Sequence, residues 1–436
     1  MDLMRAYREC NFDEVKHQLS LGADESLLGW TRLFHVVVFG TGEHLVDLVT
    51  SPEYSLADLE KKDKCDRDPL LLALLLGDMS KASILTAAGV TTHHLFSTQS
   101  EYLVSQDNPE ILSFVLDLYD YDNDSIQKQL MASAISTDSY RCVQFFLENG
   151  FDFDAKFCDD IQGSADMFVF LYSQGLKVEK FPTWNNARDA LIAKLLGYEL
   201  DPFFGYYGFE DTIRFSAYDY FKDRKPVYGT RNPERANKPF WLSMIKSGKD
   251  ANTVDSMFEL REEVCPWHHG PTWCNRRFGQ SFTALPDGRF IEIAGEHEDH
   301  YDPNFCIYND VIVHDGKGQC DIYIYPRDVF PPTDFHTATF VQSCIYIIGS
   351  LGYPEDRTTG HTPVYALDIK SKKISKIKTQ GEMPGWISQH EAELNHKHQI
   401  VITGGNILVD KEKRDWHKNV STYLLCLKSM KWTKQG

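Results

Sequence analysis

The sequence predicts a multidomain α + β protein, in which an N-terminal α-solenoid of helix pairs precedes antiparallel β-repeats that form a propeller or part of one. Two repeated patterns predict this fold. Short apolar helical segments ending in glycine recur over residues 1–198, and an order of strand, turn, strand and glycine recurs over residues 277–436. The intervening residues 199–276 fit neither pattern, and their many aromatic side chains predict an ordered connector.

The helical part is built from units of helix, tight turn, helix and glycine stop. In the clearest unit, Asp68-Pro69-Leu70-Leu71-Leu72-Ala73 precedes Gly77, and a second helical stretch ends before Gly89. This unit resembles the Thr-Pro-Leu-His-x-Ala signature of ankyrin repeats at its proline, leucine and alanine positions, and departs from it at the first position and the histidine. Further units are expected at residues 6–21, 33–49, 102–118 and 130–148, with degenerate helices at 167–173 and 187–196.

The ankyrin resemblance implies that consecutive helix pairs stack, because no pair can bury its own apolar face, and that the concave side of the stack meets a partner. Trp30, Arg67 and Asp68 occupy turn tips in this arrangement, so they are predicted partner-binding residues. For Trp30 the alternative is a half-buried packing role, because large aromatic side chains are usually mostly buried.

The connector contains four side chains of the types that bind zinc: Cys265, His268, His269 and Cys274. Their spacing matches no familiar zinc finger, and adjacent histidines rarely reach the same ion. The sequence therefore favours a structural junction loop without a metal, with a zinc site as the alternative. A ligand site formed by the connector's aromatic residues is a second alternative.

Three copies of the β pattern carry a glycine after the second strand. These glycines are Gly295, Gly349 and Gly404, at spacings of 54 and 55 residues, close to the roughly 50 residues of a kelch blade. The pattern resembles the kelch family, whose four-stranded blades carry a glycine pair after the second strand and aromatic residues later; here only Gly404-Gly405 keeps the pair, and Trp432 lies in the last strand. Propellers usually have roughly four to eight blades, so three copies do not explain how the array closes. The alternatives are further strands that the sequence does not reveal, an open array covered by the connector, or pairing of two chains.

In each copy a polar loop follows the second strand, and the kelch resemblance implies that equivalent loops emerge on one face. We therefore predict a partner-binding site where charged and aromatic groups of three loops converge. A divalent metal or an acid–base pair in the first loop is the alternative, weakened because consecutive side chains diverge. The predicted residues are Glu296, His297, Glu298, Asp299, His300 and Tyr301 in the first loop, Tyr353, Glu355, Asp356 and Arg357 in the second, and Arg414 and Trp416 in the third.

Composition bounds the function. The formal net charge of -18 opposes binding to a phosphate backbone, so no nucleic-acid partner is expected. The N-terminal residues lack the pattern of a secretory signal, no stretch approaches the roughly 20 apolar residues of a membrane span, and ten scattered cysteines are typical of reduced thiols, so a cytoplasmic location is expected.

Phosphate-loop, dinucleotide-binding, zinc-protease and nucleophile-elbow motifs are all absent from the sequence, and no cofactor is expected. The leading hypothesis is a non-catalytic protein–protein interaction scaffold, with an inhibitor or immunity-type binder of a basic partner protein as its narrower form. The alternative is a kelch-like propeller enzyme or carbohydrate-binding protein that uses the loop face. The sequence does not predict the oligomeric state.

Overall fold

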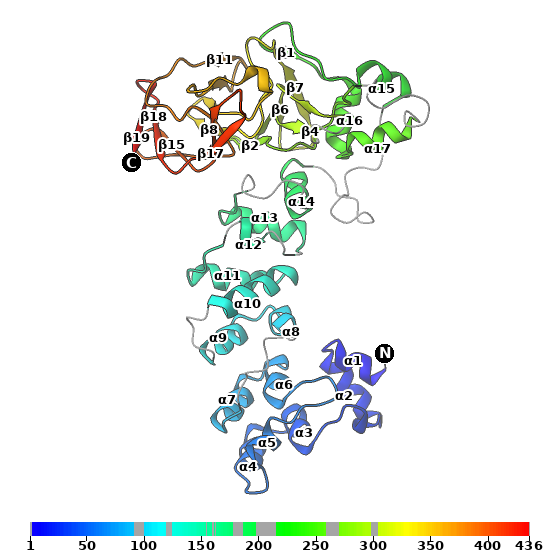
Figure 1. Cartoon of the computed structure of the whole chain (residues 1–436). Helices are drawn as coiled ribbons and strands as arrows, with labels where there is room; N and C mark the ends of the chain where they lie inside the picture. The colour runs from blue at the N-terminus through cyan, green and yellow to red at the C-terminus, as the bar shows by residue number, and fades with distance from the viewer. Residues whose placement is uncertain are drawn as a thin grey trace. The chain divides into compact units, whose positions relative to one another are not determined.

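The structure, a computed structural model, describes residues 2–90, 100–118, 124–153, 155–158, 161, 163–177, 186–197, 215–258, 270–297 and 304–435. The chain divides into two compact units, Met1–Met167 and Phe168–Gly436. It combines helices with antiparallel sheets, as Figure 1 shows, which confirms the predicted mixed α + β class. The division falls within α13 (Ala165–Ser173), upstream of the boundary predicted at residue 198.

The first unit contains helices in consecutive pairs. The two helices of each pair contact one another, and contacts between pairs join α3 to α6, α4 to α7, α6 to α8, α8 to α10 and α9 to α11. The pairs lie at the positions predicted from the sequence. Their members are α1 (Leu3–Arg8) with α2 (Phe12–Ser20), α3 (Arg32–Phe39) with α4 (Gly42–Val49), α6 (Pro69–Leu75) with α7 (Met79–Ala87), α8 (Ser100–Ser105) with α9 (Pro109–Leu118), and α10 (Asp124–Ser136) with α11 (Tyr140–Glu148).

Helix α6 shows why these segments are helical. Asp68 precedes it in an extended conformation and its Oδ1 accepts a hydrogen bond from Leu71 N at 2.8 Å, which caps the first turn. Pro69 at the first helical position costs no hydrogen bond there. Every residue of α6 is buried, so this short apolar helix is stabilised mainly by its neighbours. The two short helices α5 (Leu56–Leu59) and α12 (Ala155–Cys158) complete the unit before α13.

Among the described residues, four helices lie between α13 and strand β2. Three of them, α15, α16 and α17, pack apolar side chains against the first sheet, where Trp241 of α16 stacks on Trp273 with ring centroids 4.8 Å apart. This part of the predicted connector is therefore a folded cap on the sheet. The four helices are α14 (Asn186–Leu195), α15 (Ala217–Asp223), α16 (Pro239–Ser247) and α17 (Ala251–Met257).

Each of the three sequence copies forms an antiparallel sheet in which consecutive strands are neighbours. The first sheet contains β2 (Ser281–Ala284), β3 (Phe290–Ile293), β6 (Val311–His314) and β7 (Cys320–Ile324), with β1 (Glu234–Arg235) added beside β7. The second contains β8 (Thr337–Val341), β9 (Cys344–Ile348), β10 (Val364–Asp368) and β11 (Ile374–Lys376). The third contains β14 (Glu391–Leu394), β15 (Gln399–Thr403), β18 (Thr422–Cys426) and β19 (Lys431–Gln435), with β12 (Gln380–Gly381) parallel to β19.

The first strands of the three sheets lie side by side, because β8 contacts both β2 and β14. A histidine before each later sheet bonds back to the preceding one: His336 Nε2 lies 2.9 Å from Ser281 Oγ, and His390 Nε2 lies 2.9 Å from Thr337 Oγ1. Apolar side chains fill the space between consecutive sheets, with one core between the first and second and another between the second and third.

Two smaller sheets form in segments expected to be loops. The predicted third loop, which carries Arg414 and Trp416, is instead a hairpin of β16 (Asn406–Asp410) and β17 (Asp415–Lys418), paired with β13 (Trp386–Ser388). Its turn residue Arg414 has a φ of 52°. The start of the first predicted loop is the strand β4 (Glu296–His297), which pairs with β5 (Cys306–Ile307).

Within the described residues, no helix has both the length and the apolar character needed to cross a bilayer.

Candidate functional site

The three predicted loops meet around Arg357 in the second unit. Its guanidinium carbon lies 5.4 Å from the centre of the Trp416 ring, which belongs to the third loop. Burial lowers the pKa of Arg357, while the charges of Asp334 and Glu296 oppose this shift and that of Arg414 adds to it. Charged groups of the first and third loops therefore influence the pKa of this one side chain of the second loop.

Backbone carbonyl groups hold Arg357 in this position. Its Nε donates to Leu351 O at 2.9 Å and its Nη2 donates to Gly352 O at 2.8 Å. The same turn binds a buried carboxylate, since Asp334 accepts hydrogen bonds from Gly352 N at 2.5 Å and from Ser350 Oγ at 3.1 Å. The turn thus fixes a cation and an anion beside each other.

Asp334 and Glu296 form a carboxyl pair. Asp334 is fully buried, and burial raises the pKa of its carboxyl group. Its Oδ2 has no hydrogen-bond partner among the described residues, and the nearby Glu296 side chain opposes the rise in the pKa of Asp334. The two carboxyl groups therefore lie close enough together to influence one another.

An aromatic pocket of about 320 Å³ adjoins this turn. Tyr353 lines it and packs edge-on against Phe305, with ring centroids 6.0 Å apart, while its hydroxyl accepts a hydrogen bond from Ile307 N at 2.9 Å. Tyr228 also lines the pocket and is 44% exposed. The pocket thus offers ring edges and faces to a ligand or a side chain of a partner.

Arg327 links the pocket to the acidic residues of the second loop. Its guanidinium lies 5.7 Å from the Tyr353 ring centre and 6.0 Å from that of Tyr228. Its Nη2 pairs with Asp356 Oδ2 at 2.8 Å and with Glu355 Oε1 at 3.4 Å. Both acidic side chains are therefore held by a cation of the same unit at the rim of the pocket.

A buried ion pair stabilises the pocket floor. Arg277 Nη1 and Nη2 donate to the two oxygens of Asp310 at 2.5 Å and 3.0 Å, and Trp273 Nε1 donates to the same carboxylate at 2.8 Å. The Arg277 guanidinium lies 3.5 Å from the ring centre of Tyr308. Because both charges are paired and hydrogen bonded, their burial is tolerated. The pair holds the aromatic side chains of the pocket floor in place.

Several predicted residues have other positions. His297 is fully buried, with Nδ1 3.0 Å from Cys274 Sγ, so it does not lie on an exposed loop as predicted. Glu298, Asp299, His300 and Tyr301 lie outside the described residues, as do Cys265, His268 and His269. Within the described part of the chain, no three histidine, cysteine or carboxylate side chains are close enough together to hold a metal ion.

The predicted turn-tip residues of the first unit are less exposed than expected. Arg67 is 3% exposed and its guanidinium donates to Tyr7 O at 2.7 Å and to Arg8 O at 3.1 Å, while Asp68 caps α6. Trp30 is half-buried, and its ring packs edge-on against Tyr7. These contacts tie α1 to the turn before α6, because the carbonyl groups at the end of α1 need donors that the polar turn supplies.

Sequence reasoning missed Asp334, Arg327 and Tyr228. Asp334 precedes the second copy and Arg327 follows β7, both outside the three loops that the repeat pattern marks. Tyr228 lies in the connector, 68 residues before Glu296, where the first of these loops begins. The cluster Pro331-Pro332-Thr333-Asp334 indicates a turn but carries no sign of a buried carboxyl group.

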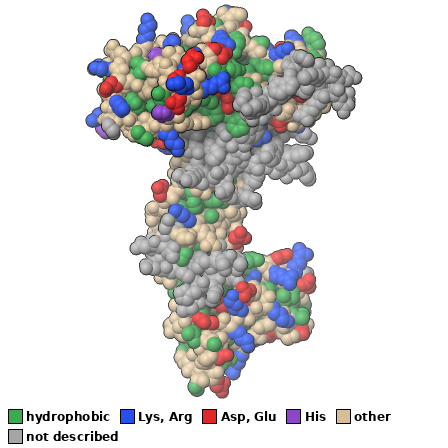
Figure 2. Space-filling view, viewed as in Figure 1, with side chains coloured by type: hydrophobic (Ala, Val, Ile, Leu, Met, Phe, Trp, Pro, Cys, Tyr) green, Lys and Arg blue, Asp and Glu red, His purple; other side chains and the backbone are tan. Residues whose placement is uncertain are grey.

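One face of the second unit mixes both signs of charge. On the face drawn in Figure 2, acidic and basic side chains are interspersed over the described sheets of the second unit. The net acidity of the chain is therefore not gathered in a single patch on this face.

Comparisons with known proteins leave the family open. No family model matches the chain, and no curated protein sequence is similar to it. A solved structure titled "Structure of YjhT" is similar at 13% sequence identity over 37% of this chain, with a TM-score of 0.27. This chain spans half the length of that protein, and the likeness is too low to assign a fold or a function.

Proposed function

We propose that this protein is a non-catalytic interaction scaffold, built from a degenerate ankyrin-like helical array and a kelch-like partial propeller, which binds another protein through the loop face around Arg357. The observation that carries the proposal is the meeting of the three loops at one half-buried cation, between Trp416 and the Glu296–Asp334 pair. Large aromatic side chains and arginine are the residue types that dominate binding energy at protein interfaces.

The repeat assignments are part of the proposal. For the kelch-like part, they are supported by three sheets with the same strand order and by contacts of β8 with β2 and β14. For the ankyrin-like part, they are supported by helix pairs that contact the following pairs. The proposal also includes a cytoplasmic location and a partner with a basic surface. A basic partner is proposed because a net charge of -18 attracts the chain to positive surfaces.

The proposal is tested by affinity capture from native lysate with the full chain, followed by mass spectrometry. Glu355→Lys with Trp416→Ala is expected to lower recovery of the partner at least fivefold, because it reverses an exposed acidic charge that would attract a basic partner and removes the aromatic surface of the loop face. Lys373→Glu is the matched control, since it reverses an exposed charge in the turn between β10 and β11 and is expected to leave recovery unchanged. Equal recovery with both variants would contradict the proposal.

A second candidate function is carbohydrate binding or conversion. The observation that favours it is the aromatic pocket near a buried carboxyl group whose pKa is raised by burial, because sugar sites combine ring faces with acid–base carboxyl groups. It predicts turnover of a sugar from a defined panel, and loss of that activity in Glu296→Gln. Turnover without any captured partner would replace the scaffold proposal with this one.

A further inference from the structure

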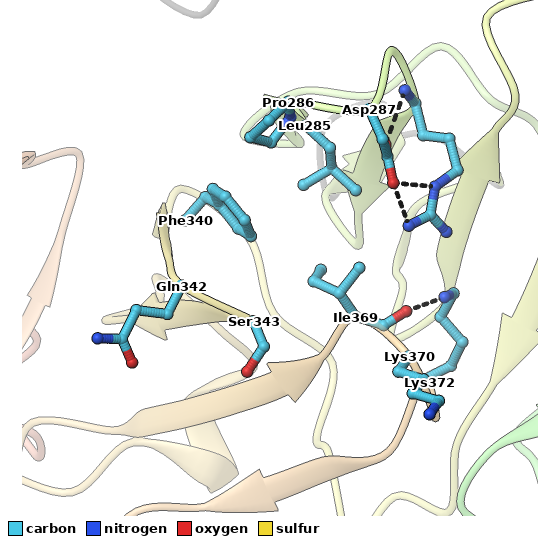
Figure 3. A pocket seen from close by; sticks show the side chains of 10 residues that line it. Leu285, Pro286, Asp287, Phe340, Gln342, Ser343, Ile369, Lys370 and Lys372 are labelled. Atoms are coloured by element: carbon cyan, nitrogen blue, oxygen red, sulfur yellow. Dashed lines mark hydrogen bonds and ion pairs between the residues drawn. The ribbon is translucent and has the colours of Figure 1, made fainter.

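A second pocket lies at the other end of the strands, away from the loop face. Three turns surround it: the β2–β3 turn with Leu285, Pro286 and Asp287, the β8–β9 turn with Gln342 and Ser343, and the β10–β11 turn with Lys370 and Lys372 (Figure 3). Its volume is about 420 Å³, within the range of small-molecule sites.

One side of this pocket is apolar. Leu285 and Ile369 are both less than one tenth exposed, and Phe340 is half-buried beside them. Figure 3 shows these three side chains around the same space, although Leu285 and Ile369 come from two different turns and Phe340 from strand β8. An apolar group of a ligand would therefore be removed from water on this side.

The other side is basic. Lys372 is only 8% exposed, and its Nζ donates a hydrogen bond to Ile369 O. Within the described part of the chain, no carboxylate lies within ion-pair distance of that Nζ. Arg289 is bound by Asp287, with Nε and Nη2 at 3.0 Å and 2.7 Å from Oδ2, and Lys370 is exposed at the rim.

The charges that line the pocket are unbalanced. Arg289, Lys370 and Lys372 bring three positive groups against the single carboxylate of Asp287. Burial, and after it the nearby charge of Arg289, lowers the pKa of Lys372, while Asp368, Asp287 and Asp321 oppose the shift. A like charge beside a buried ammonium group is unfavourable, and an anion placed between them would relieve it.

We propose that this pocket binds a small organic anion whose acid group lies between Lys372 and Arg289 and whose apolar body packs on Leu285, Phe340 and Ile369. The site is distinct from the loop face and does not depend on the function proposed for it. Because the net charge of -18 opposes binding of anions in general, the local excess of cations in this pocket is what would favour binding of one here.

The test uses the full chain and the probe 4-fluorophenylacetate, which has an acid group on an aromatic body. Binding of the probe is measured by the broadening of its fluorine NMR line. We expect saturable binding of this acid that is at least tenfold tighter than binding of the neutral 4-fluorophenylacetamide. Inorganic phosphate at the same concentration is expected to displace little of the probe, because it lacks the apolar body. Equal affinity for the acid and the amide would overturn the proposal. So would displacement of most of the probe by phosphate at the same concentration, or no binding of the probe up to millimolar concentration.

Two neighbouring lysines provide the matched variants. Lys372→Met removes the buried charge and is expected to weaken binding of 4-fluorophenylacetate at least fivefold, whereas Lys373→Met removes the exposed charge of the next residue, which does not line the pocket, and is expected to change it less than twofold. If circular dichroism shows that Lys372→Met is unfolded, Arg289→Gln decides, with an expected loss of at least threefold. Equal effects of Lys372→Met and Lys373→Met in folded proteins would also overturn the proposal.

Discussion

At the scale of single residues, the burial of an ion pair determines how much it contributes to stability. The Arg277–Asp310 pair is almost completely buried, whereas the pair of Arg235 with Asp321 on the same sheet is well exposed. Removing one partner of a buried pair leaves an uncompensated charge in the core, but an exposed pair loses little, because water replaces the partner.

We therefore expect Asp310→Ala to lower the free energy of unfolding by about 3 to 5 kcal/mol. Arg235→Ala, the matched control, is expected to lower it by less than about 1 kcal/mol. Urea denaturation followed by tryptophan fluorescence measures both, since Trp273 contacts Asp310 directly. Equal losses in the two variants would show that the buried pair is not what stabilises the pocket floor.

The histidines between the sheets make stability depend on pH. Burial lowers the pKa of His336 and of His390 from the usual 6.5 to about 3. Between these values the unfolded chain binds a proton that the folded chain does not, so stability is complete above pH 6.5 and falls as the pH decreases towards 3.

For each histidine the loss at pH 5.5 is on the order of 1 kcal/mol. His336→Asn is therefore expected to reduce the difference in unfolding free energy between pH 7.5 and pH 5.5 by about that amount. His396→Asn is the control, because His396 is exposed. Denaturation curves at the two pH values measure the difference, and an unchanged difference in His336→Asn would exclude this role.

At the scale of elements, the repeated glycines have unequal packing. Gly349 has a φ of 77°, and a Cβ atom there would lie 2.4 Å from Ile387 O and 2.6 Å from His390 Cε1, at the start of the next sheet. Gly404 also has a positive φ, of 62°, but a Cβ atom would meet nothing within 4 Å. A side chain at position 349 is therefore disfavoured by both backbone strain and a steric clash. At position 404 it is disfavoured by backbone strain alone.

We expect Gly404→Ala to cost about 1 kcal/mol of stability and Gly349→Ala clearly more, at least about 2 kcal/mol, because it also separates two sheets. Thermal unfolding of the two variants compares them under the same conditions. A larger loss in Gly404→Ala would contradict the idea that the recurring glycine serves the contact between sheets.

The elements were more predictable than the site. Helix pairs and the four strands of each copy follow from local apolar periodicity, which needs only neighbouring residues. The β16–β17 hairpin was missed because Lys411, Glu412, Lys413 and Arg414 have the composition of a solvated loop. The burial of His297 and the contact of Asp334 with Glu296 depend on pairing between distant segments, which periodicity does not report.

At the scale of the whole molecule, the start of the second unit matters for its stability. Leu191 and Leu196 of the α14 segment are buried, Gly318 N donates to Leu196 O at 2.8 Å, and a Cβ atom on Gly197 would lie 2.9 Å from the backbone of Lys317. The end of α14 is thus in close contact with the turn between β6 and β7, although the sequence pattern assigns it to the helical repeats.

This contact predicts that a fragment of residues 186–436 unfolds in urea at a higher midpoint than a fragment of residues 199–436, since only the longer one keeps α14. Loss of its buried leucines is expected to cost at least about 2 kcal/mol, because each buried leucine side chain contributes roughly that much. Full chain carrying Gly197→Leu is the independent check, because the added side chain would push α14 from the β6–β7 turn without shortening the chain. If the two fragments have equal midpoints and Gly197→Leu leaves the midpoint of the full chain unchanged, α14 does not stabilise the second unit. The helix would then belong to the helical repeats, and the second unit would begin after residue 198.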